Sequence, residues 1–216
     1  TNDDPVLLNG LDVNGGELTV YEKNLSDGTS PNTPALTQNG TFTVSALDGL
    51  QTLTVGGIAV ITNGVAAGFP QSIVTPLGST LTISGYDPAT GVVSYSYTLA
   101  DNEAHPTANG ANSLTENFDV VATDTDGSTA SGQINVNIVD DLPTAHADAA
   151  SVAEGGTVSG NVLNNDIGGA DGPAVTGAVI GVRAGADTST SAIGGLNSQI
   201  NGTYAFLTLD PNDNAV

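Results

Sequence analysis

The chain has 216 residues, of which 23 are acidic and two are basic, so its formal net charge at pH 7 is −21. A surface this acidic excludes nucleic-acid binding and attraction to anionic membranes, because both need basic side chains. Cysteine is absent, so no disulfide framework stabilises the fold, and a bound metal is a common substitute. No run approaches the roughly 18 apolar residues of a membrane span.

Alternation of β-branched or aromatic residues with polar ones predicts strands along the whole chain. Asp-Gly, Asn-Gly and Gly-Gly pairs separate the runs and predict tight turns. The pattern predicts an all-β protein built from antiparallel β-sandwiches. The predicted strands of the first part are Glu17–Glu22, Thr41–Ala46, Thr52–Val55, Thr80–Ser84, Val92–Leu99, Phe118–Thr123 and Gln133–Val139.

An acidic string occurs twice, as Asn2-Asp3-Asp4-Pro5 and again as Asp140-Asp141-Leu142-Pro143. Each string precedes a strand-like run with a lone glutamate, Glu22 in the first case and Glu154 in the second. The repetition predicts two tandem modules, residues 1–140 and 141–216, joined by an extended proline-containing linker.

The second module is predicted to have strands at Ala174–Val182 and Gly202–Leu209. It lacks a counterpart of the predicted hairpin Phe118–Val139, so we expect it to be incomplete, with an unpaired sheet edge.

Loops of a Greek-key sandwich alternate between its two ends, which predicts where the acidic side chains gather. One group is expected at the junction of the modules, and an equivalent group is expected at the far end of the first module. The junction group comprises Glu22, Asp101, Glu103, Asp140 and Asp141 of the first module and Asn165 and Asp166 of the second. The far-end group comprises Asp3, Asp4, Asp124 and Asp126.

Such groups predict a bound cation. Two like charges 4 Å apart repel by roughly 1 kcal/mol in water and about 4 kcal/mol near a protein surface. Lys23 and Arg183 are the only basic residues available to neutralise them. Oxygen-only donor sets favour Ca²⁺, whereas zinc, copper and iron prefer nitrogen or sulfur ligands.

Three segments of the first module resemble the repeat domains of large type I-secreted bacterial adhesins. They are GGELTVYEKNLSDGTSP (15–31), SYSYTLADNEAHP (94–106) and VVATDTDGSTASGQINVNIVDDLPTA (120–145). The second module, with SVAEGGTVSGNVLNND (151–166) and NGTYAFLTLD (201–210), resembles the cadherin-like repeats of the same proteins.

This resemblance implies Ig-like extender domains at the bacterial cell surface, in proteins that support adhesion and biofilm formation. The domains would form a stalk stiffened by Ca²⁺ at the linkers, and their partners would be calcium ions and neighbouring modules. The chain departs from the family in two respects: the second module lacks the closing DxDG hairpin, and no GGxGxD array is present.

Alternatives remain at the level of sequence. Asp27, Asp48 and Asp87 are interpreted as turn residues. His105 and His146 are isolated, with no nucleophile between them, so we expect no catalytic triad and no enzyme. The rival function is direct binding of a glycan or a protein. A concave, aromatic-lined face on the sheet would favour that function. An accessory domain of a secreted hydrolase is a third interpretation.

Overall fold

The computed structural model describes residues 4–105, 111–172, 177–211 and 214–215. The chain divides into two compact units, Thr1–Asp141 and Leu142–Val216. The division falls one residue after the boundary expected from the repeated acidic string.

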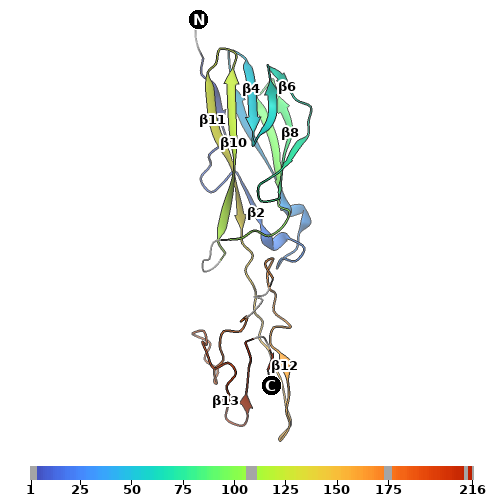
Figure 1. Ribbon diagram of the computed structural model, residues 1–216, viewed down its shortest axis with the longest axis vertical. Coiled ribbons are helices and arrows are strands. Elements are labelled where there is room, and N and C mark those ends of the chain that lie inside the picture. Colours follow the sequence, from blue (N-terminus) through green and yellow to red (C-terminus); the bar gives the residue numbers. More distant parts are fainter. Residues whose placement is uncertain (1–3, 106–110, 173–176, 212–213, 216) are drawn as a thin grey trace. The chain divides into compact units, whose positions relative to one another are not determined.

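The first unit is a β-sandwich of two sheets (Figure 1). One sheet has the strand order β1-β3-β9-β8-β7, and the other has the order β2-β11-β10-β4-β5-β6. The first sheet comprises β1 (Leu7–Asn9), β3 (Thr37–Ser45), β7 (Gln71–Val74), β8 (Thr80–Asp87) and β9 (Val92–Thr98). The second comprises β2 (Leu18–Tyr21), β4 (Leu50–Val55), β5 (Ile58–Thr62), β6 (Val65–Ala66), β10 (Ser113–Asp124) and β11 (Thr129–Val139). The prediction of an all-β fold is confirmed.

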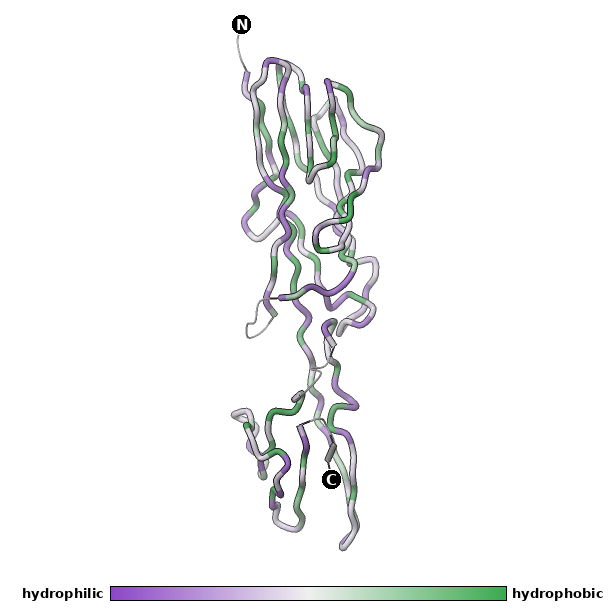
Figure 2. Tube along the Cα trace, in the orientation of Figure 1, coloured by the Kyte–Doolittle hydropathy of each residue, from purple (hydrophilic) through white to green (hydrophobic). Residues whose placement is uncertain are grey.

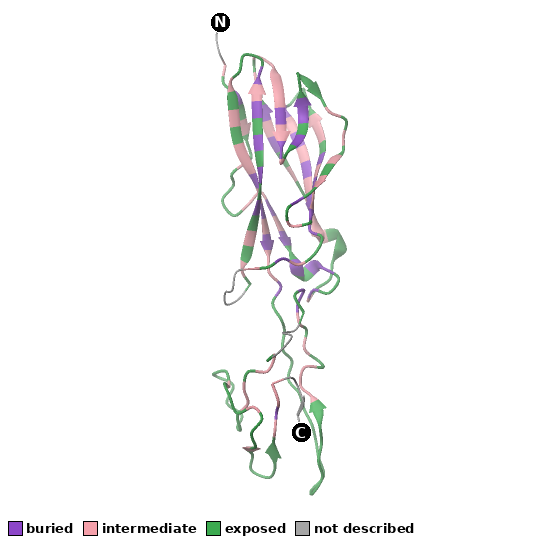
Figure 3. Ribbon diagram, in the orientation of Figure 1, coloured by how far each residue is buried: buried purple, intermediate pink, exposed green. Residues whose placement is uncertain are grey.

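Burial alternates along the longer strands, as a sheet with one face on a core requires. The pattern is strict in β9 and β10. For the strands of the first unit, Figure 2 shows hydropathy changing along the tube, and Figure 3 shows bands of buried and exposed ribbon. Phe42, Tyr95, Tyr97 and Leu53 are at most 2% exposed and fill the space between the sheets.

The longest ladder is the antiparallel pair β10–β11, which runs from Ser113 opposite Val139 to Thr123 opposite Thr129. We call the end of the sandwich at the β10–β11 turn the hairpin end, and the end where the chain leaves β11 the exit end. β2 pairs with β11 in parallel, with Tyr21 opposite Val139, so β2 also finishes at the exit end. Two short 3-10 helices, η1 (Glu22–Asn24) and η2 (Thr33–Leu36), follow there.

All seven strand-like runs of the first module lie in strands, with small differences at their ends. Glu22 is one such difference, because it opens η1 instead of ending β2. Sequence alternation missed β1, β5, β6 and β7. In β5 the run Ile58-Ala59-Val60-Ile61 does not alternate, because a register shift between Leu53 and Thr54 of its partner strand places Val60 and Ile61 both in the core.

The second unit contains two ladders of two residue pairs each, β12–β15 and β13–β14. Its strands are β12 (Gly160–Asn161), β13 (Ile200–Asn201), β14 (Phe206–Leu207) and β15 (Asn214–Ala215). The predicted strand Gly202–Leu209 is reduced to β14. Of the predicted strand Ala174–Val182, residues 174–176 lie outside the described residues, and the remainder makes a single bridge at Gly181. The described part of this unit therefore forms no sandwich.

Candidate functional site: two acidic clusters at the ends of the sandwich

The first cluster lies at the exit end and comprises Glu22, His105 and Asp140. One donor atom from each of these residues lies within 4.8 Å of the others. The parallel pairing of Tyr21 with Val139 explains how Glu22 and Asp140 meet, because they are the residues that directly follow the paired strands. His105 arrives from the loop after β9.

The exit-end cluster is centred on a buried carboxylate, that of Glu22, while His105 and Asp140 are half-buried. Glu22 is fully buried, and its Oε1 accepts the Glu103 N–H at 2.7 Å and lies 3.0 Å from His105 Nε2. The His105 side chain is 4% exposed. Within the described part of the chain, His105 Nδ1 and Glu103 Oε1 are buried without a hydrogen-bond partner. Buried polar atoms of this kind call for a further ligand or an ordered water.

Glu103 lies beside this cluster, and the charges of the neighbouring carboxylates shift its pKa. Burial, followed by the charges of Glu116, Glu22 and Asp101, raises the pKa of Glu103, and His105 opposes the shift. The Glu116 carboxylate is itself buried, accepting the Tyr97 hydroxyl at 2.7 Å. The exit end therefore gathers several carboxylates, and few buried hydrogen-bond donors lie there to offset their negative charge.

Two other residues predicted for this end lie outside the cluster of donors. Asp101 is exposed, and its carboxylate accepts the N–H of Asn102 at 3.0 Å. The Asp141 carboxylate accepts the Thr29 N–H at 2.8 Å and the Thr29 hydroxyl at 2.5 Å. Asp141 thus fixes the loop after η1, a role that its position after Asp140 did not indicate.

The second cluster lies at the hairpin end and comprises Asp48, Asp124 and Asp126, whose donor atoms also lie within 4.8 Å of one another. Asp124 is 1% exposed. Its Oδ1 accepts three backbone N–H groups of the β10–β11 turn, from Asp126 (3.2 Å), Gly127 (2.9 Å) and Ser128 (2.8 Å). Its Oδ2 is buried without a hydrogen-bond partner among the residues described.

The turn holds Asp124 in its ionised form. Burial alone would raise the pKa of Asp124, but the hydrogen bonds from Asp126, Ser128 and Gly127 outweigh it and lower the pKa. A carboxylate that is kept ionised and has one oxygen left over is suited to ligate a cation.

Asp48 belongs to this cluster, although the sequence indicated only a turn residue there. Its carboxylate accepts the Asp4 N–H at 2.9 Å, and its backbone carbonyl accepts the Thr125 hydroxyl at 2.6 Å. Asp4 therefore meets the cluster through its backbone, and Asp3 lies outside the described residues. Asp48 lies in the connection between β3 and β4. The path of this connection depends on tertiary packing, so the alternation of residues along the chain does not predict that Asp48 lies here.

Asn165 and Asp166, the ligands predicted from the second unit, make hydrogen bonds inside that unit. Asp166 Oδ1 accepts the His146 N–H at 2.6 Å, and Asn165 Nδ2 donates to the Ala147 carbonyl at 3.2 Å. Together with the bridge between Thr144 and Ile167, these bonds fix the segment that opens the unit.

The two clusters differ in donor chemistry. The hairpin end offers carboxylates alone, which suits a hard cation such as Ca²⁺. At the exit end the imidazole of His105 lies beside two carboxylates, so a donor set that includes it is not oxygen-only. Imidazole nitrogen extends the range of suitable ions to transition metals. A lone histidine in a loop gave no sign of this in the sequence.

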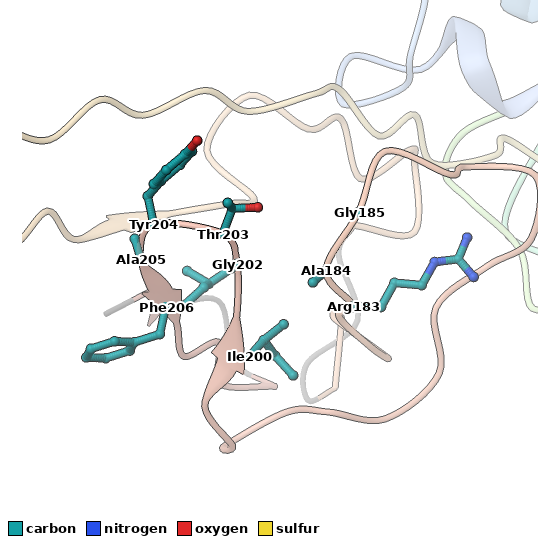
Figure 4. A pocket seen from close by; sticks show the side chains of 10 residues that line it. Arg183, Ala184, Gly185, Ile200, Gly202, Thr203, Tyr204, Ala205 and Phe206 are labelled. Carbon is teal, nitrogen blue, oxygen red and sulfur yellow. The ribbon is translucent and has the colours of Figure 1, made fainter.

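Two hollows lie among the described residues of the second unit. One, of about 390 Å³, is lined by the β13–β14 hairpin and by Arg183 and its neighbours (Figure 4). Tyr204 is 99% exposed and Phe206 is 64% exposed on this hairpin. The Arg183 guanidinium bonds Thr190 and the Asp187 carbonyl, so it closes its own loop. The other hollow, of about 560 Å³, lies beside Leu163 and other residues of the same unit.

Comparison with protein-family models finds no match to this chain, and comparison with curated protein sequences finds none either. Among the described residues, no helix has the length and apolar character needed to cross a membrane.

Proposed function

We propose that this chain is a structural spacer, or extender, from a large secreted adhesin at the bacterial cell surface. In this proposal divalent cations, Ca²⁺ first, stiffen the ends of its modules, and the stalk supports adhesion and biofilm formation. The proposal combines the family resemblance of the sequence with the two acidic clusters of the sandwich. Its partners are calcium ions and the neighbouring modules of the same protein.

One observation carries the proposal: a single pair of strands has an acidic cluster at each of its ends. Asp124 and Asp126 lie at the turn between β10 and β11, and Asp140 directly follows β11. At about 3.3 Å per residue, the ten steps along β11 separate the clusters by roughly 33 Å. A module that can bind a cation at either end is suited to serial connection.

The physical mechanism is local. Without a cation, the carboxylates of each cluster repel one another, and the segments that carry them are free to separate. With a cation, the same oxygens become ligands and the segments are held together. At the exit end these segments are the start of η1, the loop bearing His105 and the chain after β11. At the hairpin end they are the β3–β4 connection and the β10–β11 turn.

The decisive experiment is a calcium titration of the full chain by calorimetry, with thermal unfolding recorded in Ca²⁺ and in chelator. We expect binding and a higher melting temperature in Ca²⁺. Asp124→Asn should remove one binding event, because an asparagine oxygen can still accept the turn N–H groups but has lost the charge. Asp140→Asn tests the exit end in the same way.

Asp87→Asn is the matched control. Asp87 accepts the Ala89 N–H and the Thr90 hydroxyl in its own turn and belongs to neither cluster. Its substitution should leave calcium binding unchanged. Equal melting curves in Ca²⁺ and in chelator, with no heat of binding, would refute the cation-stiffened spacer.

A second candidate function is ligand binding by the second unit, which the exposure of Tyr204 and Phe206 beside a hollow favours. Solvent-exposed aromatic rings are common contacts for sugars and proteins because their burial contributes much apolar area. Screening of the full chain on a glycan array, with Tyr204→Ala and Phe206→Ala as variants, separates this function from a spacer. Ligand capture that both variants abolish would favour the binding module.

A further inference from the structure

The segment between β1 and β2 (residues 10–17) leaves one sheet and joins the other, and two carboxylates fix it along β11. Asp12 donates its N–H to the Gln133 carbonyl at 3.0 Å, and its Oδ1 accepts the Gln133 N–H at 3.0 Å. Glu17 repeats the arrangement with Asn135: its N–H donates to the carbonyl at 2.8 Å and its Oε2 accepts the N–H at 2.5 Å. Each side chain supplies the acceptor that a neighbouring strand would supply.

Glycines on both sides permit this close approach. Gly16 has a φ of +92°, and a Cβ there would lie 2.9 Å from the Asn135 carbonyl oxygen. At Gly132 a Cβ would lie 2.8 Å from Asp12 Oδ2. The other carboxylate oxygen of Glu17 accepts the Val13 N–H at 2.8 Å. This bond joins two residues within the segment 10–17.

The pairing runs in one direction. Asp12 lies beside Gln133, Glu17 beside Asn135, and β2 then follows β11 as far as Tyr21 opposite Val139. The chain therefore enters at the hairpin end, where the Asp4 N–H bonds Asp48, and descends parallel to β11. β11 itself leaves at the exit end. Tension between the two ends of the unit pulls residues 12–21 and β11 in opposite directions along their common axis.

We propose that residues 12–21 and β11 form a force-resisting clamp. In this clamp Asp12 and Glu17, which precede β2 in the chain, extend the parallel β2–β11 pair beyond the N-terminal end of β2. The hydrogen bonds across this pair are directed between the strands, so sliding stretches all of them together. Peeling the same strands apart would break them one after another. The biological use of the clamp rests on the proposed spacer function, but its mechanics do not.

The test is forced unfolding of the full chain held by handles at its two ends, at constant force. Unfolding under force reports the unfolding rate, and so responds to bonds broken at the barrier. The first unit is recognised by its length, because roughly 135 residues at about 3.5 Å each release about 450 Å of chain once the folded length is subtracted. Glu17→Gln should unfold at least about tenfold faster, because its amide cannot accept both N–H groups of Val13 and Asn135.

Asp12→Asn should show a smaller acceleration, because Asp12 is exposed. Asp119→Asn is the matched control on the neighbouring strand. Asp119 is also exposed and also bonds Gln133, but it accepts only the side-chain amide, at 2.7 Å. The control should unfold at the wild-type rate. Rates for Glu17→Gln and Asp12→Asn equal to that of Asp119→Asn would overturn the clamp.

A second pulling direction needs no change in the clamp. The chain has no cysteine, so Ser26→Cys, in the exposed loop after η1, provides a unique handle near the exit end. Pulling between this handle and the C-terminus peels β2 from β11, and the first unit should yield at a much lower force than in end-to-end pulling. Equal forces in the two directions would refute the clamp even if the carboxylate variants did not fold.

Both measurements are made in Ca²⁺ and in chelator. The clamp predicts the same ratio between variant and wild-type rates in either solution. A chain that shows no calcium effect but keeps the ratio refutes the cation-stiffened spacer and supports the clamp. If calcium changes the unfolding but the variants unfold at the wild-type rate, the result supports the cation-stiffened spacer and refutes the clamp.

Discussion

The two units both contain many valine, isoleucine, leucine and alanine residues, but they differ greatly in strand length and in the burial of these residues. In the first unit, β10 and β11 pair without interruption from Ser113 to Thr123, and their inward residues are buried. In the second unit no described strand exceeds two residues, and among its described residues the only buried apolar ones are Ala170 and Leu209. Figure 3 shows the contrast as buried and exposed ribbon within each unit. Apolar content alone therefore does not make a core.

Strand length explains the difference. A long strand with a period of two presents a continuous apolar face, which a second sheet can cover. In the second unit glycine is denser, and it interrupts the runs of valine and isoleucine. Ile180, Ile193 and Phe206 are consequently more than half exposed, although they would be core residues by type. The stability of the chain should thus reside in the first unit.

The strongest test of this contrast is a pair of truncations. Leu53→Ala, at a fully buried position, should lower the free energy of unfolding by about 2–5 kcal/mol, because it leaves a cavity between the sheets. Ile193→Ala, at a position 86% exposed in the second unit, should change it by less than about 0.5 kcal/mol. Urea unfolding followed by tyrosine fluorescence measures both. Equal losses would show that the second unit has a core of its own.

A pair of tyrosines gives a smaller expected effect. The Tyr97 hydroxyl is buried and donates to Glu116, so Tyr97→Phe should cost about 1–3 kcal/mol by removing a donor from a buried carboxylate. Tyr204→Phe, in the second unit, should cost nothing measurable, because that side chain is 99% exposed. The same urea experiment compares them. A loss for Tyr204→Phe would mean that its hydroxyl has a structural partner.

The smallest expected effect concerns pH. Because the pKa of Glu103 is raised in the folded chain, first by burial and then by neighbouring carboxylates, its ionisation opposes folding. This cost is present above the folded pKa and disappears as the pH falls below the unfolded value, which is about 4.3. Glu103→Gln should therefore stabilise the cation-free chain at pH 7, by no more than about 1 kcal/mol.

The control for Glu103 is Glu154→Gln in the second unit, where the glutamate is exposed. It should leave unfolding unchanged at every pH. Thermal melts in chelator between pH 4 and pH 7 measure both variants. A destabilised Glu103→Gln at pH 7 would mean that the ionised carboxylate is needed by the fold.

The fold of the first unit was largely predictable because its information is local. Period-two alternation identified β2, β3, β4, β8, β9, β10 and β11, and the pairs Gly56-Gly57 and Asn63-Gly64 identified turns whose residues all have positive φ. The missed strands lack that local signal. β5 is shifted by a bulge, and β1 and β6 are only three and two residues long.

The clusters were predictable in part. Glu22 with Asp140, and Asp124 with Asp126, are acidic residues at strand ends, which sequence and strand order can place at a common end of a sandwich. His105 and Asp48 completed the clusters from loops whose paths depend on tertiary packing. Asp101 and Asp141 lie at the predicted end but outside the group of three, and their carboxylates accept hydrogen bonds from Asn102 and Thr29.

The sequence by itself determined an all-β chain, strongly acidic, with a break near residue 141, because composition, alternation and turn residues act over a few neighbouring positions. Tertiary structure decided which acidic groups share a site and that Asp12 and Glu17 extend the pairing along β11. The contacts of Asp12 and Glu17 join positions about 120 residues apart, and the parallel approach of β2 to β11 brings them within hydrogen-bonding distance.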